Sequence, residues 1–231
     1  IYYILNLFNQ PKVKLKTGCK LLFPLDQFLK KLSLLEECNS YTRDLKTFFP
    51  DFSLKNNDIV IDIGAHIGSF SIPLARDHKN IFVYGYEPNP FNFRYYTKNV
   101  DLNNLKNRVK VFQEAITNED GYSKFDFGFT STTGVVKGIE PHLIKDGRKL
   151  STFTDLSKTG IQTKCTSIKS IFERNEIREC KLIKIDCEGS EYEIFNKIDK
   201  AILNKIMYLI LEVHPTSDHK PSELSSLFKR N

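Results

Sequence analysis

The sequence lacks the cysteine patterns of a disulfide-bonded or zinc-binding protein. Its five cysteines are an odd number, lie far apart and include no CxxC pair. This usage is typical of a reducing compartment, so we expect a cytoplasmic protein. Cys187 lies beside an acidic cluster, but no histidine pattern near it indicates an activated nucleophile. We interpret it as a buried structural thiol.

Long apolar runs are also missing. No run approaches the roughly 18 to 20 residues that a membrane-spanning helix needs. The opening segment, IYYILNLF, is too short for a span and has neither a basic n-region nor a cleavage site, so it does not resemble a signal peptide. The sequence does not begin with methionine, and we interpret it as a fragment whose N-terminal anchor, if one exists, lies outside it.

The bulk composition is typical of a soluble globular protein. The 231 residues are enough for one sizeable core, and 40% of them are hydrophobic while 27% are charged. The net charge of +6 is compatible with a nucleic-acid partner, but a surplus of this size is more often a solvated face. Composition alone therefore does not name a partner.

Two regions of the chain differ in pattern. Residues 1–57 contain LDQFLKKLSLLEECNSY, whose apolar spacing predicts an amphipathic helix, so we expect a mostly helical lead-in. Over residues 58–231, short apolar runs alternate with helical patterns, which indicates one α/β domain with a parallel, doubly wound, Rossmann-like sheet. The strands are predicted in DIVIDIG, IFVYGYE, RVKVFQEAI, KLIKIDCEG and MYLILEVH.

An insertion interrupts this alternation at about residues 124–165. The segment YSKFDFGF alternates between apolar and polar residues and predicts an antiparallel strand. Residues 130–160 are rich in Thr, Ser, Gly and Lys, so we expect a loop near the ligand face. After the last predicted strand, Pro221 to Phe228 predicts one more helix.

Acidic residues and a histidine gather at the predicted strand ends. Ligands of open parallel sheets bind beyond the carboxyl ends of the strands, where the connections diverge. The polar residues at these ends are Asp62, Glu87, Glu114, Asp186, Glu188 and His214. Their convergence predicts a ligand site at this edge of the sheet.

The first predicted strand leads into a loop, DIGAHIG, that restricts the choice of ligand. Gly64 lets the turn tighten, and Gly68 allows a close approach to the ligand as the next helix begins, with Ser69 near its N-cap. A dinucleotide loop needs glycine at position 66, but the His66 side chain would obstruct a pyrophosphate. The loop therefore favours a nucleoside without phosphate and disfavours an NAD-dependent oxidoreductase.

Glu87 ends the second predicted strand, at a position that matches Asp62 in the first. Its carboxylate is suited to accept hydrogen bonds from both hydroxyls of a ribose. The alternative is that it caps the following helix. For the neighbouring Asn89, capping that helix is an equal alternative to a cofactor contact. A carboxylate at this strand end is therefore the expected ribose ligand.

The third strand end is the expected adenine site. Glu114, Ala115 and Ile116 are expected to flank the ring, although simple packing is an alternative for the last two. A phosphate-free nucleoside bound in this way indicates S-adenosylmethionine. The residues predicted to contact this cofactor are Asp62, Gly64, Ala65, His66, Gly68, Ser69, Glu87, Pro88, Asn89, Glu114, Ala115 and Ile116.

Five segments occur in a characteristic order and spacing: VIDIGAHIGSFSI, VYGYEPNP, VFQEAI, LIKIDCEGSEYEIF and LILEVHP. Over about residues 58–215 the sequence resembles the FkbM family of class I methyltransferases, and KIDCEGSE is its most distinctive motif. The resemblance implies methylation of a hydroxyl, commonly on a sugar or a polyketide-type natural product. A sheet of this kind usually continues with an edge hairpin after EVHP, which the sequence lacks, so we expect a C-terminal truncation.

The motif KIDCEGSE brings three acids to one strand-to-helix turn. Asp186 and Glu188 share side-chain parity, while Glu191 is expected to favour the helix N-terminus. Our hypothesis is that Asp186 lies under the transferred methyl or the acceptor, and that Glu188 is the general base or orients the acceptor. His214 is expected to assist proton removal, with a structural role as the alternative. The acids could instead cap the helix and bind Lys184 or a cation, but no spacing supports a metal site.

Two other functions remain open. EPNPFNFRYYTKNVDLNN resembles a segment of some tRNA-modifying enzymes, which would suit an RNA methyltransferase. Against it, IDCEGS stands where an amino-methylating enzyme has an NPPY-type motif, and no RNA-binding module is visible, so nucleic acid is disfavoured. The other is a degenerate domain that binds a nucleoside without catalysis. The expected partner is a small-molecule or glycan acceptor; neither its identity nor the oligomeric state is encoded.

Overall fold

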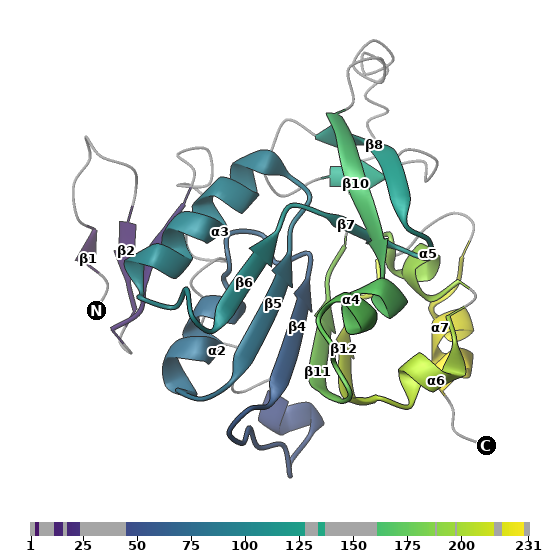
Figure 1. The fold of residues 1–231 in the computed structure, drawn as a ribbon, viewed down its shortest axis with the longest axis horizontal. Helices are drawn as coiled ribbons and strands as arrows, with labels where there is room; N and C mark the ends of the chain where they lie inside the picture. The colour runs from purple at the N-terminus through teal and green to yellow at the C-terminus, as the bar shows by residue number, and fades with distance from the viewer. Residues whose placement is uncertain are drawn as a thin grey trace.

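The computed structural model describes residues 3–4, 12–15, 18–23, 45–127, 134–136, 161–187, 189–196, 198–214 and 219–228. At the centre is a parallel sheet (Figure 1). The chain forms its middle strand first, continues to one edge and then crosses over to build the other edge. From edge to edge, the strands are β12 (Ile206–Leu211), β11 (Cys180–Ile185), β4 (Ile59–Ile63), β5 (Phe82–Tyr86) and β6 (Val109–Phe112). This order confirms the predicted doubly wound α/β sheet, and its switch point lies between β4 and β11.

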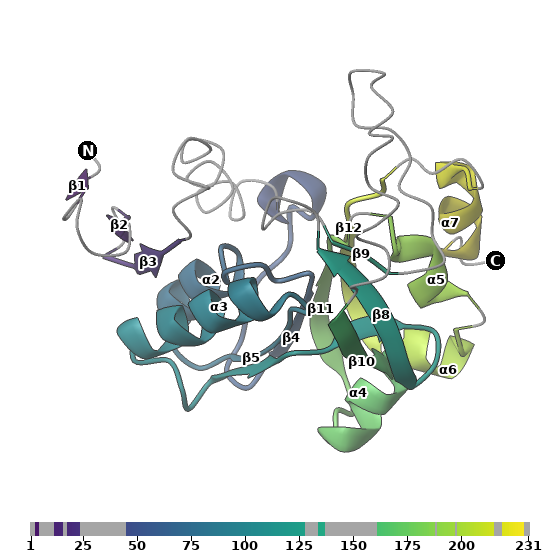
Figure 2. The same cartoon turned by 90° about the horizontal axis from the view of Figure 1, so that it is seen from above.

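Helices cover both faces of this sheet (Figure 2). Successive residues of β4 point to opposite faces: Val60 packs in one core and Ile61 in the other. This is why the strand reads as a continuous apolar run. In the described part of the chain, no helix is long and apolar enough to cross a bilayer. The first core contains α2 (Ser71–Asp77) and α3 (Pro90–Leu102); the second contains α4 (Ile168–Arg174), α5 (Glu191–Phe195), α6 (Lys200–Leu203) and the predicted α7 (Pro221–Phe228).

The helix starts after β4 and β5 differ in how they are capped. The side chain of Asn89 caps α3, because its Oδ1 accepts from the N–H of Phe91 at 2.9 Å, and Pro90 occupies the first helical position. Ser69 lies immediately before the N-cap of α2, which agrees with its expected place near that cap. The chain remains in a turn up to Phe70, which is the N-cap of α2 and makes no side-chain capping bond.

A second sheet lies beyond the carboxyl ends of the parallel strands (Figure 1). The predicted strand RVKVFQEAI is divided, with β6 in the parallel sheet and its continuation in this second one. The described part of YSKFDFGF, residues 122–127, lies in an antiparallel strand, as predicted. Most of the predicted loop over residues 130–160 lies outside the described residues. The order of the second sheet is β7 (Ala115–Thr117), β10 (Ile161–Ser167), β8 (Gly121–Phe127) and β9 (Gly134–Val136).

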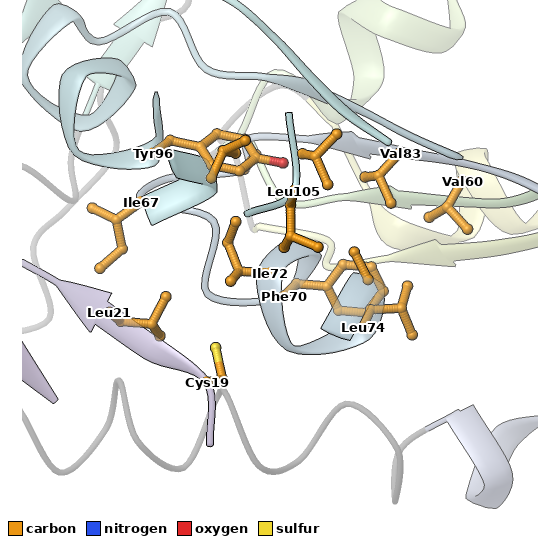
Figure 3. Packing of buried hydrophobic residues seen from close by; sticks show 14 of the residues in the cluster. Cys19, Leu21, Val60, Ile67, Phe70, Ile72, Leu74, Val83, Tyr96 and Leu105 are labelled. Carbon is orange, nitrogen blue, oxygen red and sulfur yellow. The ribbon is translucent and has the colours of Figure 1, made fainter. Parts of the chain in front are cut away.

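The described residues of the lead-in include both strands and a short helix. Residues 45–48 are helical, and three strands that the pattern did not predict form an antiparallel sheet: β1 (Tyr3–Ile4), β2 (Lys12–Lys14) and β3 (Lys20–Leu22). Cys19 and Leu21 are buried in the same core as Ile67 and Ile72, which lie after β4 (Figure 3). The helix predicted over residues 25–41 lies outside the described residues. The boundaries of lead-in, domain and insertion stay predictions.

Two asparagines of α3 join the lead-in sheet to the main body. The Asn99 side chain accepts from the N–H of Leu22 at 2.6 Å and donates to the carbonyl of the same residue at 3.0 Å. One turn later, Asn103 pairs with Lys20 in the same way. Asn99 also donates to the carbonyl of Ile67 at 2.9 Å. One buried side chain therefore holds both β3 and the loop after β4.

We expect Asn99→Ala to lower the free energy of unfolding by about 2–4 kcal/mol, because it leaves three backbone groups of Leu22 and Ile67 without their partner. Urea denaturation would measure this. The matched control is Thr97→Ala, which changes an exposed residue of the same helix and is expected to shift stability by less than about 0.5 kcal/mol. Equal stability of the two variants would contradict the bridging role of Asn99.

Candidate functional site

The loop after β4 is held between the ends of its two neighbouring strands. The N–H groups of Gly64 and Ala65 both donate to the carbonyl of Tyr86, at the end of β5, at 3.0 Å. Gly64 has a φ of +73°, and a Cβ there would overlap the carbonyl oxygen of Asp186, just after β11. Gly64 therefore allows the backbones at the switch point to touch.

Gly68 lies against a buried side chain of α3. Its φ is +83°, and a Cβ there would overlap the ring of Tyr96 in α3 and lie 2.9 Å from Cγ1 of Ile72. The close approach at this glycine is thus to the protein's own buried tyrosine. The expected approach of a ligand to the backbone at this glycine stays a prediction.

Glu87 is the centre of a hydrogen-bond network at the end of β5. It is buried, its Oε2 accepts from the N–H of His66 at 2.8 Å, and its Oε1 accepts from the N–H of Asn89 at 2.9 Å and from Asn92 at 3.4 Å. Burial raises the pKa of Glu87 to about 7. Because a carboxylate has about four acceptor positions, Oε2 has capacity for another donor.

Asp62 supplies a second acceptor in the same region. It is fully buried in β4, and its Oδ2 accepts from the hydroxyl of Ser71. Its Oδ1 has no hydrogen-bond partner among the described residues. Burial raises the pKa of Asp62, and the charge of Lys184 opposes that shift. S-adenosylmethionine carries ribose hydroxyls and an ammonium group, so its donors suit acceptors of this kind, and the residues present fit the cofactor.

Glu114 has a role that the sequence did not predict. Its two oxygens accept from Lys164 at 2.9 Å, Thr166 at 2.8 Å and Arg174 at 2.9 and 3.0 Å. Burial opposes ionisation, but the hydrogen bonds from Arg174, Lys164 and Thr166 outweigh it and lower the pKa of Glu114. These bonds occupy the carboxylate and link it to β10 and α4, while the adenine contact of this residue stays a prediction.

The other two expected adenine neighbours are also accounted for by packing. Ala115 and Ile116 are buried in β7, where they pair with β10. Ile116 belongs to the core that contains α4 to α7. The described contacts of both residues are packing contacts, which is the alternative that the sequence left open.

The acids and the histidine at the ends of β11 and β12 lie together. Oxygen or nitrogen atoms of Asp186, Glu212 and His214 are all within 4.8 Å of one another. Lys184 Nζ lies 3.1 Å from Oδ2 of Asp186 and supplies a positive charge beside the two acids. The pKa of Glu212 is raised by burial and by the charge of Asp186. Glu188 lies outside the described residues, so its catalytic role stays a prediction.

Glu191 belongs to this group, although its sequence position indicated only a helix N-terminus. It is fully buried at the first residue of α5, and its Oε1 lies 2.9 Å from Nδ1 of His214. The same oxygen accepts from the N–H groups of Cys187 at 3.0 Å and Gly189 at 3.3 Å. The only signal in the sequence was its position two residues after the glycine of a turn. Such a local pattern does not show that the side chain is buried. Burial also raises the pKa of the Cys187 thiol well above its usual value.

Fold and site together define a doubly wound α/β protein with a nucleoside-type site at its switch point. The family described as the methyltransferase FkbM domain matches residues 62–230, so the chain belongs to this family of S-adenosylmethionine-dependent methyltransferases. The resemblance of the five sequence segments to that family is thereby confirmed.

Two methyltransferases match most of this chain, which spans three-fifths to two-thirds of their own length. The 31-O-demethyl-FK506 methyltransferase FkbM of Streptomyces tacrolimicus is 26% identical over 70% of this chain and 67% of that enzyme. The hexuronic acid methyltransferase AglP of Haloferax volcanii is 25% identical over 72% of this chain and 60% of that enzyme. Two tRNA-modifying enzymes match only 27% and 24% of this chain. The solved structure of M. jannaschii TYW2 with AdoMet is 26% identical over 48% of each chain, with a TM-score of 0.37.

Proposed function

We propose that this chain transfers a methyl group from S-adenosylmethionine to a hydroxyl of a small-molecule or glycan acceptor. The main support is that the expected cofactor loop and the acidic cluster are in contact. Gly64, in the loop after β4, lies against the backbone of Asp186, and the side chain of Asp186 lies close to His214. Groups that can orient a hydroxyl and take its proton therefore lie next to the expected cofactor loop. Two relatives, an O-demethyl-FK506 methyltransferase and a hexuronic acid methyltransferase, support this acceptor class by their names.

The cofactor side of the proposal rests on fewer residues than the sequence suggested. Glu87 would accept from the ribose, and the backbone of residues 64–69 would line the nucleoside; Glu114 is left out because its oxygens are occupied. Bound S-adenosylmethionine supplies an electrophilic methyl on its sulfonium. The chain's own task is then to place the acceptor hydroxyl and remove its proton.

We assign these two tasks to Asp186 and His214. Asp186 accepts a hydrogen bond from the acceptor or orients it, while a ring nitrogen of His214 takes the proton as the oxygen–carbon bond forms. Glu188 is retained as a candidate base. A cytoplasmic location is part of the same proposal, and the free thiols of Cys165, Cys180 and Cys187 support it.

We expect Asp186→Asn to lower turnover about 100-fold or more while cofactor affinity stays within about threefold, because a group that acts on the acceptor has little part in holding the nucleoside. The measurement is transfer of labelled methyl to a panel of a macrolide-type polyol, a uronic acid glycan and tRNA. Asp101→Asn is the control, since this exposed residue of α3 pairs only with Lys106 among the described residues. Unchanged turnover would contradict the role of Asp186, and label on tRNA alone would favour the RNA methyltransferase.

A further inference from the structure

A buried acid and a partly exposed histidine form a close pair behind the proposed methyl-transfer site. Glu191 is fully buried, whereas the side chain of His214 is 25% exposed. Oε1 of Glu191 lies 2.9 Å from Nδ1 of His214. One partner is thus sealed in the protein while the other reaches the surface of the site.

The carboxylate of Glu191 is held in place independently of the histidine. Its Oε1 also accepts from the N–H groups of Cys187 and Gly189, in the turn after β11. An oxygen that accepts from two N–H groups carries no hydrogen of its own. It therefore also acts as an acceptor toward the imidazole, and Nδ1 of His214 is the atom that carries the hydrogen.

The other oxygen of Glu191 indicates that stability alone does not explain the residue. Oε2 is buried and has no hydrogen-bond partner among the described residues. An unpaired buried acceptor opposes folding. A glutamate at this position is accounted for if its charge acts on His214.

The second nitrogen of His214 faces the acidic cluster. Nε2 lies 3.8 Å from Oε1 of Glu212, in the group that also contains Asp186. Among the described residues, the ammonium of Lys184 is a further charge next to this group, because it forms an ion pair with Asp186. A hydrogen on Nδ1 leaves Nε2 as the basic nitrogen on the side where the acceptor hydroxyl is proposed to lie.

We infer that Glu191 is a positioning residue that holds His214 in the tautomer whose Nε2 accepts the proton of the methyl acceptor; this rests on the proposed function. As the oxygen–methyl bond forms and the sulfur–methyl bond breaks, the hydroxyl proton moves to Nε2. His214 then carries hydrogen on both nitrogens, and the buried carboxylate stabilises that cation through Nδ1.

The test combines spectroscopy and kinetics. In ¹⁵N-histidine spectra, with the His214 signal assigned from a His214→Asn variant, the wild type should show neutral His214 with hydrogen on Nδ1. In Glu191→Gln, an amide that can donate to Nδ1 should move the hydrogen toward Nε2. Turnover should then fall about 100-fold with cofactor affinity within about threefold, and the acidic limb of the pH profile should move to lower pH because a negative charge is gone.

Glu193→Gln is the matched control, because it removes a carboxylate from the same helix and should leave the tautomer, turnover and pH profile unchanged. Hydrogen on Nε2 in the wild type would overturn the inference without any variant, and so would a Glu191→Gln protein with unaltered tautomer and turnover. The proposed function fails separately, if the wild type methylates no hydroxyl acceptor in the panel.

Discussion

Gly64→Ala is expected to destabilise the protein by at least about 4 kcal/mol and to abolish adenosine binding. The added Cβ would overlap the carbonyl oxygen of Asp186 and lie 2.8 Å from its carbonyl carbon. That obstacle is backbone at the end of β11, whose pairing with β4 at Ile63 and Ile185 keeps it from moving away. The φ of +73° adds a conformational cost for any residue with a side chain.

Chemical denaturation and calorimetric titration with adenosine would measure both effects. Gly121→Ala provides the matched control, because a Cβ at Gly121 has no heavy atom within 4 Å and needs no left-handed backbone. We expect that variant to fold and to bind adenosine as the wild type does. A Gly64→Ala protein within about 1 kcal/mol of the wild type would show that the strand ends at the switch point can separate.

Glu87→Gln is expected to weaken adenosine binding about 10- to 100-fold at pH 8. A hydrogen bond to a charged acceptor contributes about 1.5–3 kcal/mol, and 1.4 kcal/mol corresponds to a tenfold change in affinity. Adenosine is the suitable probe, because it lacks the amino acid part of the cofactor and does not titrate near neutral pH. Calorimetric titration from pH 5.5 to 8.5 would measure the effect.

The wild-type affinity should also depend on pH in a defined direction. Since burial raises the pKa of Glu87 to about 7, the carboxyl is protonated below that pH and loses an acceptor position. Affinity should therefore rise as the pH increases through about 7, level off above it, and be flat across this range in Glu87→Gln. Glu179→Gln is the control. This exposed carboxyl lies just before β11, at the amino-terminal ends of the parallel strands, whereas the site lies at their carboxyl ends. A wild-type affinity that is flat over the same range would contradict the ribose role.

The sequence by itself determined the parallel sheet and the position of its ligand edge. Continuous apolar runs such as that before Asp62 arise because both faces of a strand are buried, and this signal is local. The acids that end those runs had to lie at one edge, since parallel strands all finish on the same side. Glu87, Asp186 and His214 could therefore be selected as site candidates from their chain positions alone. Five segments in order, with KIDCEGSE the most distinctive, were sufficient to recognise the family.

Only the tertiary structure decided which polar groups meet. Glu114 pairs with Arg174 60 residues away, and Asn99 pairs with Leu22 77 residues away, so neither bond leaves a periodic trace in the sequence. The same reason hid the burial of Glu191, whose partner lies 23 residues later at the end of another strand. Periodicity reports which side of an element faces the core, whereas the partner of a buried charge depends on how separate elements pack.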